Sequence, residues 1–264
     1  MAQVKFALGV EYDGASFHGW QTQPHARNAQ DVLQAALSRV ADHPVEVVAA
    51  GRTDTGVHAT GQVVHFLTTA QRPERAWLLG ANSALPEDLA VQWVRPVDDR
   101  FHARYAAVAR RYRYTVLRAP VRSALLRRRA WWVHQPLDVP AMTAAAASLL
   151  GEHDFSAFRA AACQAKRPWR RLQRIALRED GECLHLEFTA NAFLHHMVRN
   201  LVGVLYRIGR GEAGAGWAAE VLKARDRRHR GVTAPAHGLC LVGVDYPAEF
   251  GLPGPVGGWG GPGR

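Results

Sequence analysis

Strand and helix patterns follow the same order, β-α-β-β-α-β, twice along this chain of 264 residues. In the first half, the patterns predict strands at 4–12, 45–50, 62–67 and 89–97 and helices at 29–41 and 74–82. In the second half, they predict strands at 110–117, 172–177, 183–189 and 239–245 and helices at 139–150, 193–208 and 217–224. Asp138 is placed to cap the helix that follows it. The repeat predicts an α+β fold of two ferredoxin-like halves whose sheets combine.

The predicted division of the chain follows from this repeat. We expect an N-terminal α+β half at 1–104 and a C-terminal α+β half at 105–250. The remaining residues, 251–264, contain seven Gly and three Pro without a helical or strand period. Such a composition buries too little apolar surface to offset the entropy of ordering, so this tail is predicted to be disordered.

Apolar runs and cysteines indicate the cellular compartment. No run of 18 or more apolar residues is present, and the N-terminus does not resemble a signal peptide, so we expect no membrane association. The three cysteines, Cys163, Cys183 and Cys240, are isolated from one another. This spacing excludes a disulfide framework and argues against a zinc site built from cysteines. The expected location is the cytoplasm.

The charge pattern indicates a polyanionic partner. The chain has 33 Lys and Arg against 23 Asp and Glu, a formal net charge of +10. Residues 100–129 contain ten Arg, three Tyr and no acidic residue. Residues 159–178 contain seven basic residues and no acidic residue. Two acid-free basic segments are typical of a nucleic-acid-binding surface.

Several cofactor motifs are missing or out of context. Residues 209–214 match GxGxxG by letters, but they follow a predicted helix, whereas a dinucleotide-binding loop follows a strand. The sequence has neither a P-loop nor a GxSxG motif. His195 and His196 are adjacent within the predicted helix at 193–208, where neighbouring side chains diverge by about 100°. A packing or hydrogen-bonding role is therefore predicted for them, and neither a metal nor a nucleotide cofactor is expected.

The loop GRTDTGVH, residues 51–58, has a composition suited to chemistry. Asp54 is the only carboxylate between Glu46 and Glu74. Glycines in and beside the loop would let its backbone adopt positive φ and approach a ligand closely. On composition alone, however, the simpler interpretation is an ordinary strand connection in which Asp54 caps a turn or pairs with Arg52.

The segment GRTDTGVHATGQVVHF (51–66) resembles the Asp-containing motif of the TruA-type tRNA pseudouridine synthase family. The resemblance extends to EYDGASFHGWQ (11–21), NSALPEDLAV (82–91), FHARYAAVARRYRY (101–114) and NAFLHHMVRNLVG (191–203). These segments have the order of the family and span nearly the whole chain before the tail. One departure is Thr55, where the family often has Ala. The resemblance implies that the two halves together form the pseudouridine synthase fold.

The family resemblance implies a specific isomerisation without metal or cofactor. Members convert uridine to pseudouridine at positions 38, 39 and 40 of the tRNA anticodon stem-loop, breaking the N1–C1′ bond and joining C5 to C1′. Asp54 matches the catalytic aspartate, a nucleophile. Whether it attacks C1′, adds to C6 or takes the 2′ proton stays open. A single carboxylate suits this reaction better than glycoside hydrolysis, which typically needs two.

The resemblance also assigns roles to other side chains and to a partner. Arg52 matches the residue that enters the base stack when the uridine is flipped, Tyr112 the tyrosine that packs against uracil, and Arg199 the arginine that pairs with the catalytic carboxylate. Family members are homodimers with tRNA lying across both subunits. Expected tRNA contacts are Arg104, Arg110, Arg111, Lys166, Arg167 and Arg170.

Two alternatives from other functional classes stay open. The protein could be an RNA-binding module without catalysis, because ferredoxin-like sheets bearing tyrosines also read RNA. It could also be an RNA nucleosidase or hydrolase that uses Asp54. Product analysis separates these possibilities, because isomerisation leaves the mass and length of the RNA unchanged.

Overall fold

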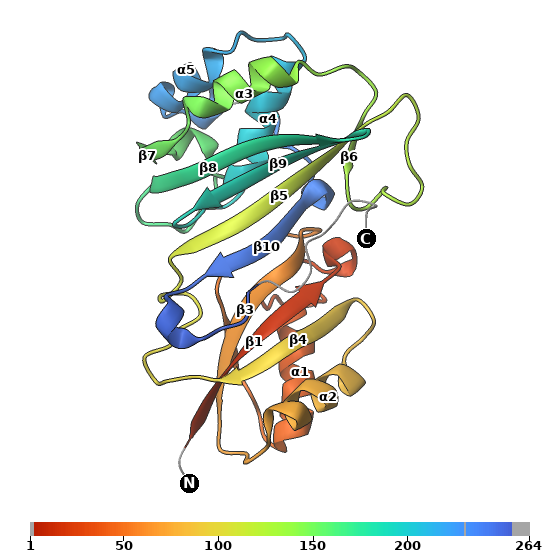
Figure 1. Ribbon diagram of the computed structural model, residues 1–264, viewed down its shortest axis with the longest axis vertical. Coiled ribbons are helices and arrows are strands. Elements are labelled where there is room, and N and C mark those ends of the chain that lie inside the picture. The colour runs from red at the N-terminus through yellow and green to blue at the C-terminus, as the bar shows by residue number, and fades with distance from the viewer. Residues whose placement is uncertain (1–2, 230, 255–264) are drawn as a thin grey trace. The chain divides into compact units, whose positions relative to one another are not determined.

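The computed structural model, which describes residues 3–229 and 231–254, has the predicted α+β fold (Figure 1). Contacts between residues divide the chain into two units. Unit 1 comprises the residues up to Val108 together with those from Cys240 onward, and unit 2 comprises Ala109–Leu239.

The sheet of unit 1 is built around its first strand. Strand β1 is antiparallel to both β3 and β4, and short β2 pairs with the opposite edge of β3. The strands are β1 (Val4–Tyr12), β2 (Val47–Ala49), β3 (His58–Thr68) and β4 (Leu89–Pro96). The register between β1 and β3 shifts between Val10 and Tyr12. This irregularity lies at the end of β1 that leads toward the Asp54 loop.

Two helices of unit 1 form a core with this sheet. They are α1 (Ala29–Ala41) and α2 (Glu74–Ala84). Leu33 and Leu37 are fully buried on the apolar face predicted for α1. Trp77 of α2 packs against Phe6 of β1 and Phe66 of β3, with ring centroids 5.7 Å and 5.0 Å away. These buried aromatic rings hold α2 on the sheet.

The contacts of the last strand, β10 (Leu239–Asp245), assign it to unit 1 from Cys240 onward. It runs parallel to β3, with Cys240 opposite His58. The sequence-based division had kept residues 105–250 together and placed one boundary after residue 104, whereas the contacts divide the chain after Val108 and again before Cys240. The order of strands along the chain does not specify which strand the last one will pair with. The sequence therefore did not show that the chain returns from unit 2 to unit 1 at β10.

In unit 2, neighbouring strands pair antiparallel in the order β5-β9-β8-β7, and short β6 pairs parallel with β5. Its strands are β5 (Ala109–Arg118), β6 (Trp131–Val133), β7 (Gly151–Asp154), β8 (Trp169–Asp180) and β9 (Cys183–Ala190). Strands β8 and β9 form a hairpin around Asp180 and Gly181, and Gly181 has φ +56°. Strands β6 and β7 were not predicted, because three or four residues are too few to show a period.

The helices of unit 2 are α3 (Val139–Ala147), α4 (Met197–Gly209) and α5 (Trp217–Ala224). Asp138 caps α3 as predicted, since its carboxylate accepts a hydrogen bond from the Ala141 amide at 2.9 Å. On α4, Asn200 is fully buried and donates to the Phe158 carbonyl at 2.6 Å. This buried polar contact joins α4 to the segment before β8.

Helix α4 begins later than predicted. The prediction placed its start at Phe193, but His196 has φ +62°, in the left-handed region, and regular helix begins at Met197. A left-handed residue cannot continue a right-handed helix, so residues 193–196 form a connection. His195 and His196 therefore lie outside the helix, and the helical geometry used to interpret them was wrong.

Two further sequence-based expectations concern the membrane and the tail. None of the helices formed by residues 3–229 and 231–254 has the length and apolar character needed to span a lipid bilayer. The predicted disorder of residues 251–264 falls mostly on 255–264, which lie outside the described residues.

We predict that Gly203→Ala destabilises the protein, although alanine normally favours a helix interior by about 1 kcal/mol. A Cβ at Gly203 would lie 1.9 Å from the Val232 carbonyl oxygen, so backbone must shift. We expect a loss of about 1–3 kcal/mol in the free energy of unfolding. Gly216→Ala is the control, because a Cβ there meets no atom within 4 Å. Equal stability of the two variants in urea unfolding would contradict the close approach.

Candidate active site

The start of the Asp54 loop, which joins β2 to β3, is tied to β3 by hydrogen bonds. The Ala50 amide donates to the Val63 carbonyl at 2.8 Å. The side chain of Gln62, which is fully buried, donates through Nε2 to the Gly51 carbonyl at 2.7 Å. A buried amide with its donor satisfied in this way holds the loop in one position.

Thr53, directly before Asp54, is held through both its side chain and its backbone. Its buried Oγ1 lies 2.7 Å from the hydroxyl of Tyr12 at the end of β1. Its carbonyl accepts a hydrogen bond from the Trp20 amide at 3.1 Å. Burial raises the pKa of Tyr12 well above its ordinary value, so the phenol stays neutral. Both contacts come from residues 12–20, which comprise the last residue of β1 and the segment that follows it.

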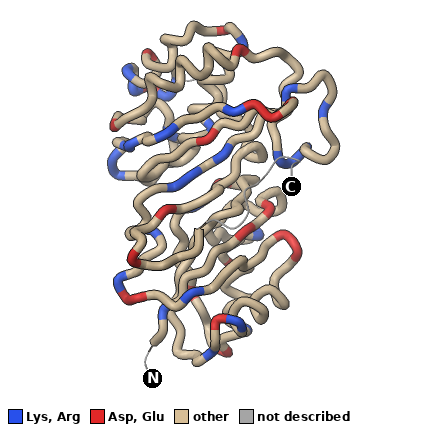
Figure 2. Tube along the Cα trace, in the orientation of Figure 1, with Lys and Arg blue, Asp and Glu red and all other residues tan. Residues whose placement is uncertain are grey.

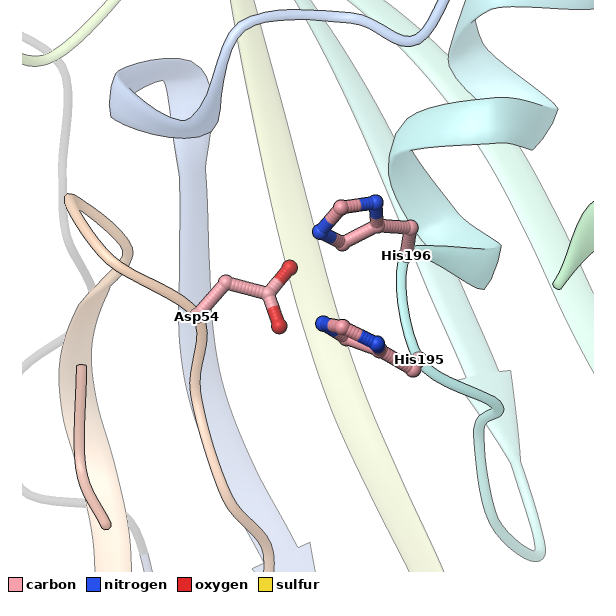
Figure 3. Close-up of side chains that lie close together, drawn as sticks. All are labelled: Asp54, His195 and His196. Carbon is pink, nitrogen blue, oxygen red and sulfur yellow. The ribbon is translucent and has the colours of Figure 1, made fainter. Parts of the chain in front are cut away.

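The backbone after Asp54 turns tightly and contacts the same segment. The Asp54 carbonyl accepts from the Val57 amide at 3.1 Å, and the Gly56 amide donates to the Phe17 carbonyl at 3.3 Å. Gly56 has φ +78°, which supports the expected use of a loop glycine. Asp54 itself is half-buried, and its carboxylate points away from the loop (Figure 3). A fixed backbone with an accessible carboxylate suits a reactive group.

Arg52 lies on the same loop, two residues before Asp54. Its side chain is exposed, unlike the buried side chain of Thr53 between them. The loop thus presents a cation and a carboxylate from one anchored stretch of backbone. This placement is compatible with the predicted base-flipping role, which stays a prediction.

In unit 2, the two tyrosines of β5 occupy the same face, because side chains two residues apart in a strand point to the same side. Tyr112 is 9% exposed and meets Phe193 edge to face, with centroids 5.1 Å apart. Tyr114 is fully buried, and its hydroxyl donates to the Pro235 carbonyl at 2.8 Å. Burial raises the pKa of Tyr114. Tyr114 is therefore a core residue, and Tyr112 lies closer to the surface of unit 2.

Arg199 lies in the first turn of α4 and is half-buried. Its Nε donates to the Ala234 carbonyl at 2.8 Å, and its own carbonyl accepts from the Ala234 amide at 3.1 Å. The side chain is therefore fixed by the segment before β10. Asp54 belongs to unit 1 and Arg199 to unit 2. Their pairing stays a prediction.

His195 and His196 precede α4, in the connection that replaces its predicted first turn (Figure 3). Their ring centroids lie 4.1 Å apart. The His195 carbonyl accepts from the Ala160 amide, and the His196 carbonyl accepts from the Asn200 amide, each at 2.9 Å. Within either unit taken alone, the described residues contain no group of three or more His, Cys, Asp or Glu spaced to hold a metal ion.

The excess of positive charge is confined to unit 2. Residues 109–239 have 23 Lys and Arg against 10 Asp and Glu, a formal charge of +13. The rest of the chain has 10 against 13, a formal charge of −3. Figure 2 shows Lys and Arg along β5 and β8. A unit with this imbalance attracts polyanions, whereas unit 1 does not.

The basic residues predicted to contact tRNA differ in exposure. Arg104, Lys166 and Arg167 are exposed. Arg110, Arg111 and Arg170 are half-buried. Arg170 donates through Nη1 to the Trp169 carbonyl at 2.6 Å, and burial lowers its pKa. The exposed three are the more accessible to a phosphate, while the half-buried three are partly engaged by the protein.

Sequence reasoning missed the residues that hold the loop. Tyr12, Gln62 and Gly19 were not singled out, although all three fall inside segments that carry the family resemblance. Gly19 has φ +90°, and a Cβ there would lie 2.7 Å from the Thr53 carbonyl oxygen. The sequence around Tyr12 and Gly19 does not indicate that these residues contact a loop about 35–40 residues away, because sequence periodicity reports only local structure.

Comparison with known proteins identifies the class of this protein. The family described as tRNA pseudouridine synthase matches residues 9–106 and 145–247, which include the Asp54 loop and α4, whereas β5 lies between the two matched ranges. The chain belongs to the tRNA pseudouridine synthase family, a family of isomerases.

Individual relatives support the same assignment over almost the full chain. The chain is 55% identical over 249 residues to tRNA pseudouridine synthase A of Methylococcus capsulatus, covering 94% of this chain and 92% of the relative. It is 54% identical over 250 residues to tRNA pseudouridine synthase A of Burkholderia thailandensis, covering 95% and 93%. The resemblance drawn from the sequence motifs is therefore confirmed.

We predict that Gly19→Ala destabilises unit 1 by displacing the Asp54 loop. Alanine disfavours φ +90°, and its Cβ would press on the Thr53 carbonyl. The expected loss in the free energy of unfolding is about 2 kcal/mol. Gly51→Ala, in the loop itself, meets no atom within 4 Å and serves as the control. Chemical unfolding of both variants measures the difference, and unchanged stability of Gly19→Ala would show that the close approach is not required.

Proposed function

We propose that the protein isomerises uridine to pseudouridine at positions 38, 39 and 40 of the tRNA anticodon stem-loop, with Asp54 as the nucleophile. The observation that carries this proposal is the Asp54 loop: one accessible carboxylate on a backbone held by buried hydrogen bonds. The family to which the chain belongs supports tRNA as the substrate. The anticodon positions rest on the motif resemblance.

The reaction needs no external reagent. The N1–C1′ bond of uridine breaks, the uracil turns, and C5 bonds to C1′. The proton that C5 loses is balanced by the proton that N1 gains, so product and substrate are isomers. A carboxylate such as Asp54 can assist by forming a transient bond to the ribose or the ring, or by taking a proton.

Other residues would prepare the uridine for this step. A base in a helical stem must be extruded before a side chain can reach it. We assign Arg52 to the space left in the stack, since it is exposed on the loop that carries Asp54. Tyr112 would pack against the extruded uracil. Arg199 would pair with Asp54 and keep its carboxylate ionised.

Binding of the tRNA backbone would fall mainly to unit 2. Its formal charge of +13 suits an RNA phosphate backbone. In unit 2, the exposed Lys166 and Arg167 are the most accessible candidates, and the half-buried Arg110, Arg111 and Arg170 would add to them. Arg104, which is also exposed, would contribute from unit 1. We further propose that the protein acts as a homodimer in the cytoplasm, with tRNA lying across both subunits and no metal or nucleotide cofactor.

Incubation with unmodified tRNA, followed by carbodiimide mapping of pseudouridine, tests the proposal directly. We expect modification at positions 38–40 with RNA of unchanged mass and length. A shortened RNA or released uracil would favour a hydrolase. Tight binding without any modification would favour an RNA-binding protein.

We predict that Asp54→Asn binds tRNA but forms no pseudouridine, because the amide is neither a nucleophile nor a base of comparable strength. Asp42→Asn is the matched control: Asp42 is exposed at the end of α1 with φ +59°, a conformation that asparagine also accepts. The control should retain full turnover. Substantial pseudouridine formation by purified Asp54→Asn would remove Asp54 from the reaction.

We predict that Arg52→Ala retains most of its tRNA affinity but loses about a hundredfold in rate on a paired target uridine. One exposed cation is a small part of the electrostatic attraction. Unstacking costs a few kcal/mol, and about 3 kcal/mol corresponds to roughly a hundredfold in rate. Arg72→Ala, another exposed arginine of unit 1, is the control.

Two stem-loops that differ only in the partner of the target uridine separate flipping from bracing of the loop. The Arg52→Ala defect should shrink on the unpaired target in single-turnover measurements, because less stacking is broken there. An equal loss on both stem-loops would show that Arg52 only braces Asp54.

A further inference from the structure

The hydroxyl of Tyr12 is a buried polar group that none of the assigned roles uses. Tyr12 is 3% exposed at the end of β1. Its ring lies among those of Phe17, edge to face at 6.2 Å, and Trp20 at 5.9 Å. In such apolar surroundings a hydroxyl needs hydrogen-bond partners, and each bond is stronger than it would be in water.

The hydrogen-bond partner of this hydroxyl lies in the Asp54 loop. It is Thr53 Oγ1, 2.7 Å away, on the residue directly before Asp54. On β3, the buried side chain of Gln62 donates to the Gly51 carbonyl at the start of the same loop. The loop is thus held at its start by Gln62 and next to Asp54 by Tyr12.

This network acts on the residue next to the reactive one. The Trp20 amide donates a hydrogen bond to the Thr53 carbonyl and so fixes the peptide group between Thr53 and Asp54. The hydrogen bond between the Tyr12 hydroxyl and Thr53 Oγ1 is a second attachment, at the Thr53 side chain. Two attachments at Thr53 restrict rotation of the chain there, and they therefore restrict the direction in which the Asp54 side chain leaves the loop.

We propose that Tyr12 is a positioning residue for Asp54: its hydroxyl, through Thr53, holds the carboxylate in the orientation that the isomerisation requires. The proposal rests on the function proposed above, in which Asp54 reacts. Reactive groups must be held to within a fraction of an ångström, and a misplacement of 1 Å can cost about a hundredfold in rate. Tyr12 is buried beneath the loop, so it acts on rate and not on RNA binding.

The Tyr12→Phe variant tests this assignment, since it removes the hydroxyl and keeps the ring. We expect the single-turnover rate at saturating tRNA to fall about tenfold, because the loop stays in place but Thr53 is held at one point only. The dissociation constant for tRNA should stay within about twofold, because the removed group is buried. A merely structural role would change the melting temperature without this separation of rate from affinity.

Tyr246→Phe is the matched control. Its hydroxyl also donates a hydrogen bond within unit 1, to the Ala103 carbonyl at 2.7 Å, and this acceptor lies outside the Asp54 loop. It should lower the melting temperature by a similar amount and leave the rate unchanged. An unchanged rate in Tyr12→Phe, or an equal loss of rate in Tyr246→Phe, would overturn the proposal.

A double-mutant cycle with Thr53→Val identifies the route. If Tyr12 acts through Thr53, the loss of rate in the double variant should equal that of Thr53→Val alone, whereas independent effects would multiply. Multiplying effects would contradict the proposed route. Asp54→Asn, measured in parallel, keeps the two proposals distinguishable: its inactivity together with full activity of Tyr12→Phe overturns only the role of Tyr12, whereas an active Asp54→Asn overturns the function itself.

Discussion

The hydrogen bond between the Tyr12 hydroxyl and Thr53 Oγ1 joins the end of β1 to the loop that carries Asp54. A glycine-containing connection would otherwise sample many conformations, and the entropy of ordering it must be offset. Here the cost is met by buried contacts on one side: Trp20 and Phe17 bond to the loop backbone, and Gln62 holds its beginning. The side of the loop that bears Arg52 and Asp54 is left more accessible.

Charge is divided unevenly between the two units. Unit 1, with the Asp54 loop, has a formal charge of −3, and unit 2 has +13. Attraction of a polyanion by unit 2 is long-ranged and does not depend on the position of any single side chain. The loop that carries Asp54, in contrast, is held by short hydrogen bonds. Substitutions in the two units are therefore expected to affect affinity and rate differently.

The late start of α4 shows how one residue changes the geometry of a site. Because His196 is left-handed, residues 193–196 leave the helix, and Phe193 packs against Tyr112 of β5. Arg199 then falls in the first turn, where its guanidinium bonds to the Ala234 carbonyl. A helix starting at Phe193 would have placed both side chains elsewhere.

Periodicity and motifs are local properties of the chain, and they were enough to predict the order of all helices and strands except β6 and β7, the bounds of β1, α1, α5 and β10, and the family. They also identified Asp54 as the solitary carboxylate of its loop. The return of β10 to pair with β3, and the bond from Tyr12 to Thr53, 41 residues away, became visible only in the folded chain. Such contacts depend on which surfaces meet after folding, and no spacing between residues encodes that choice.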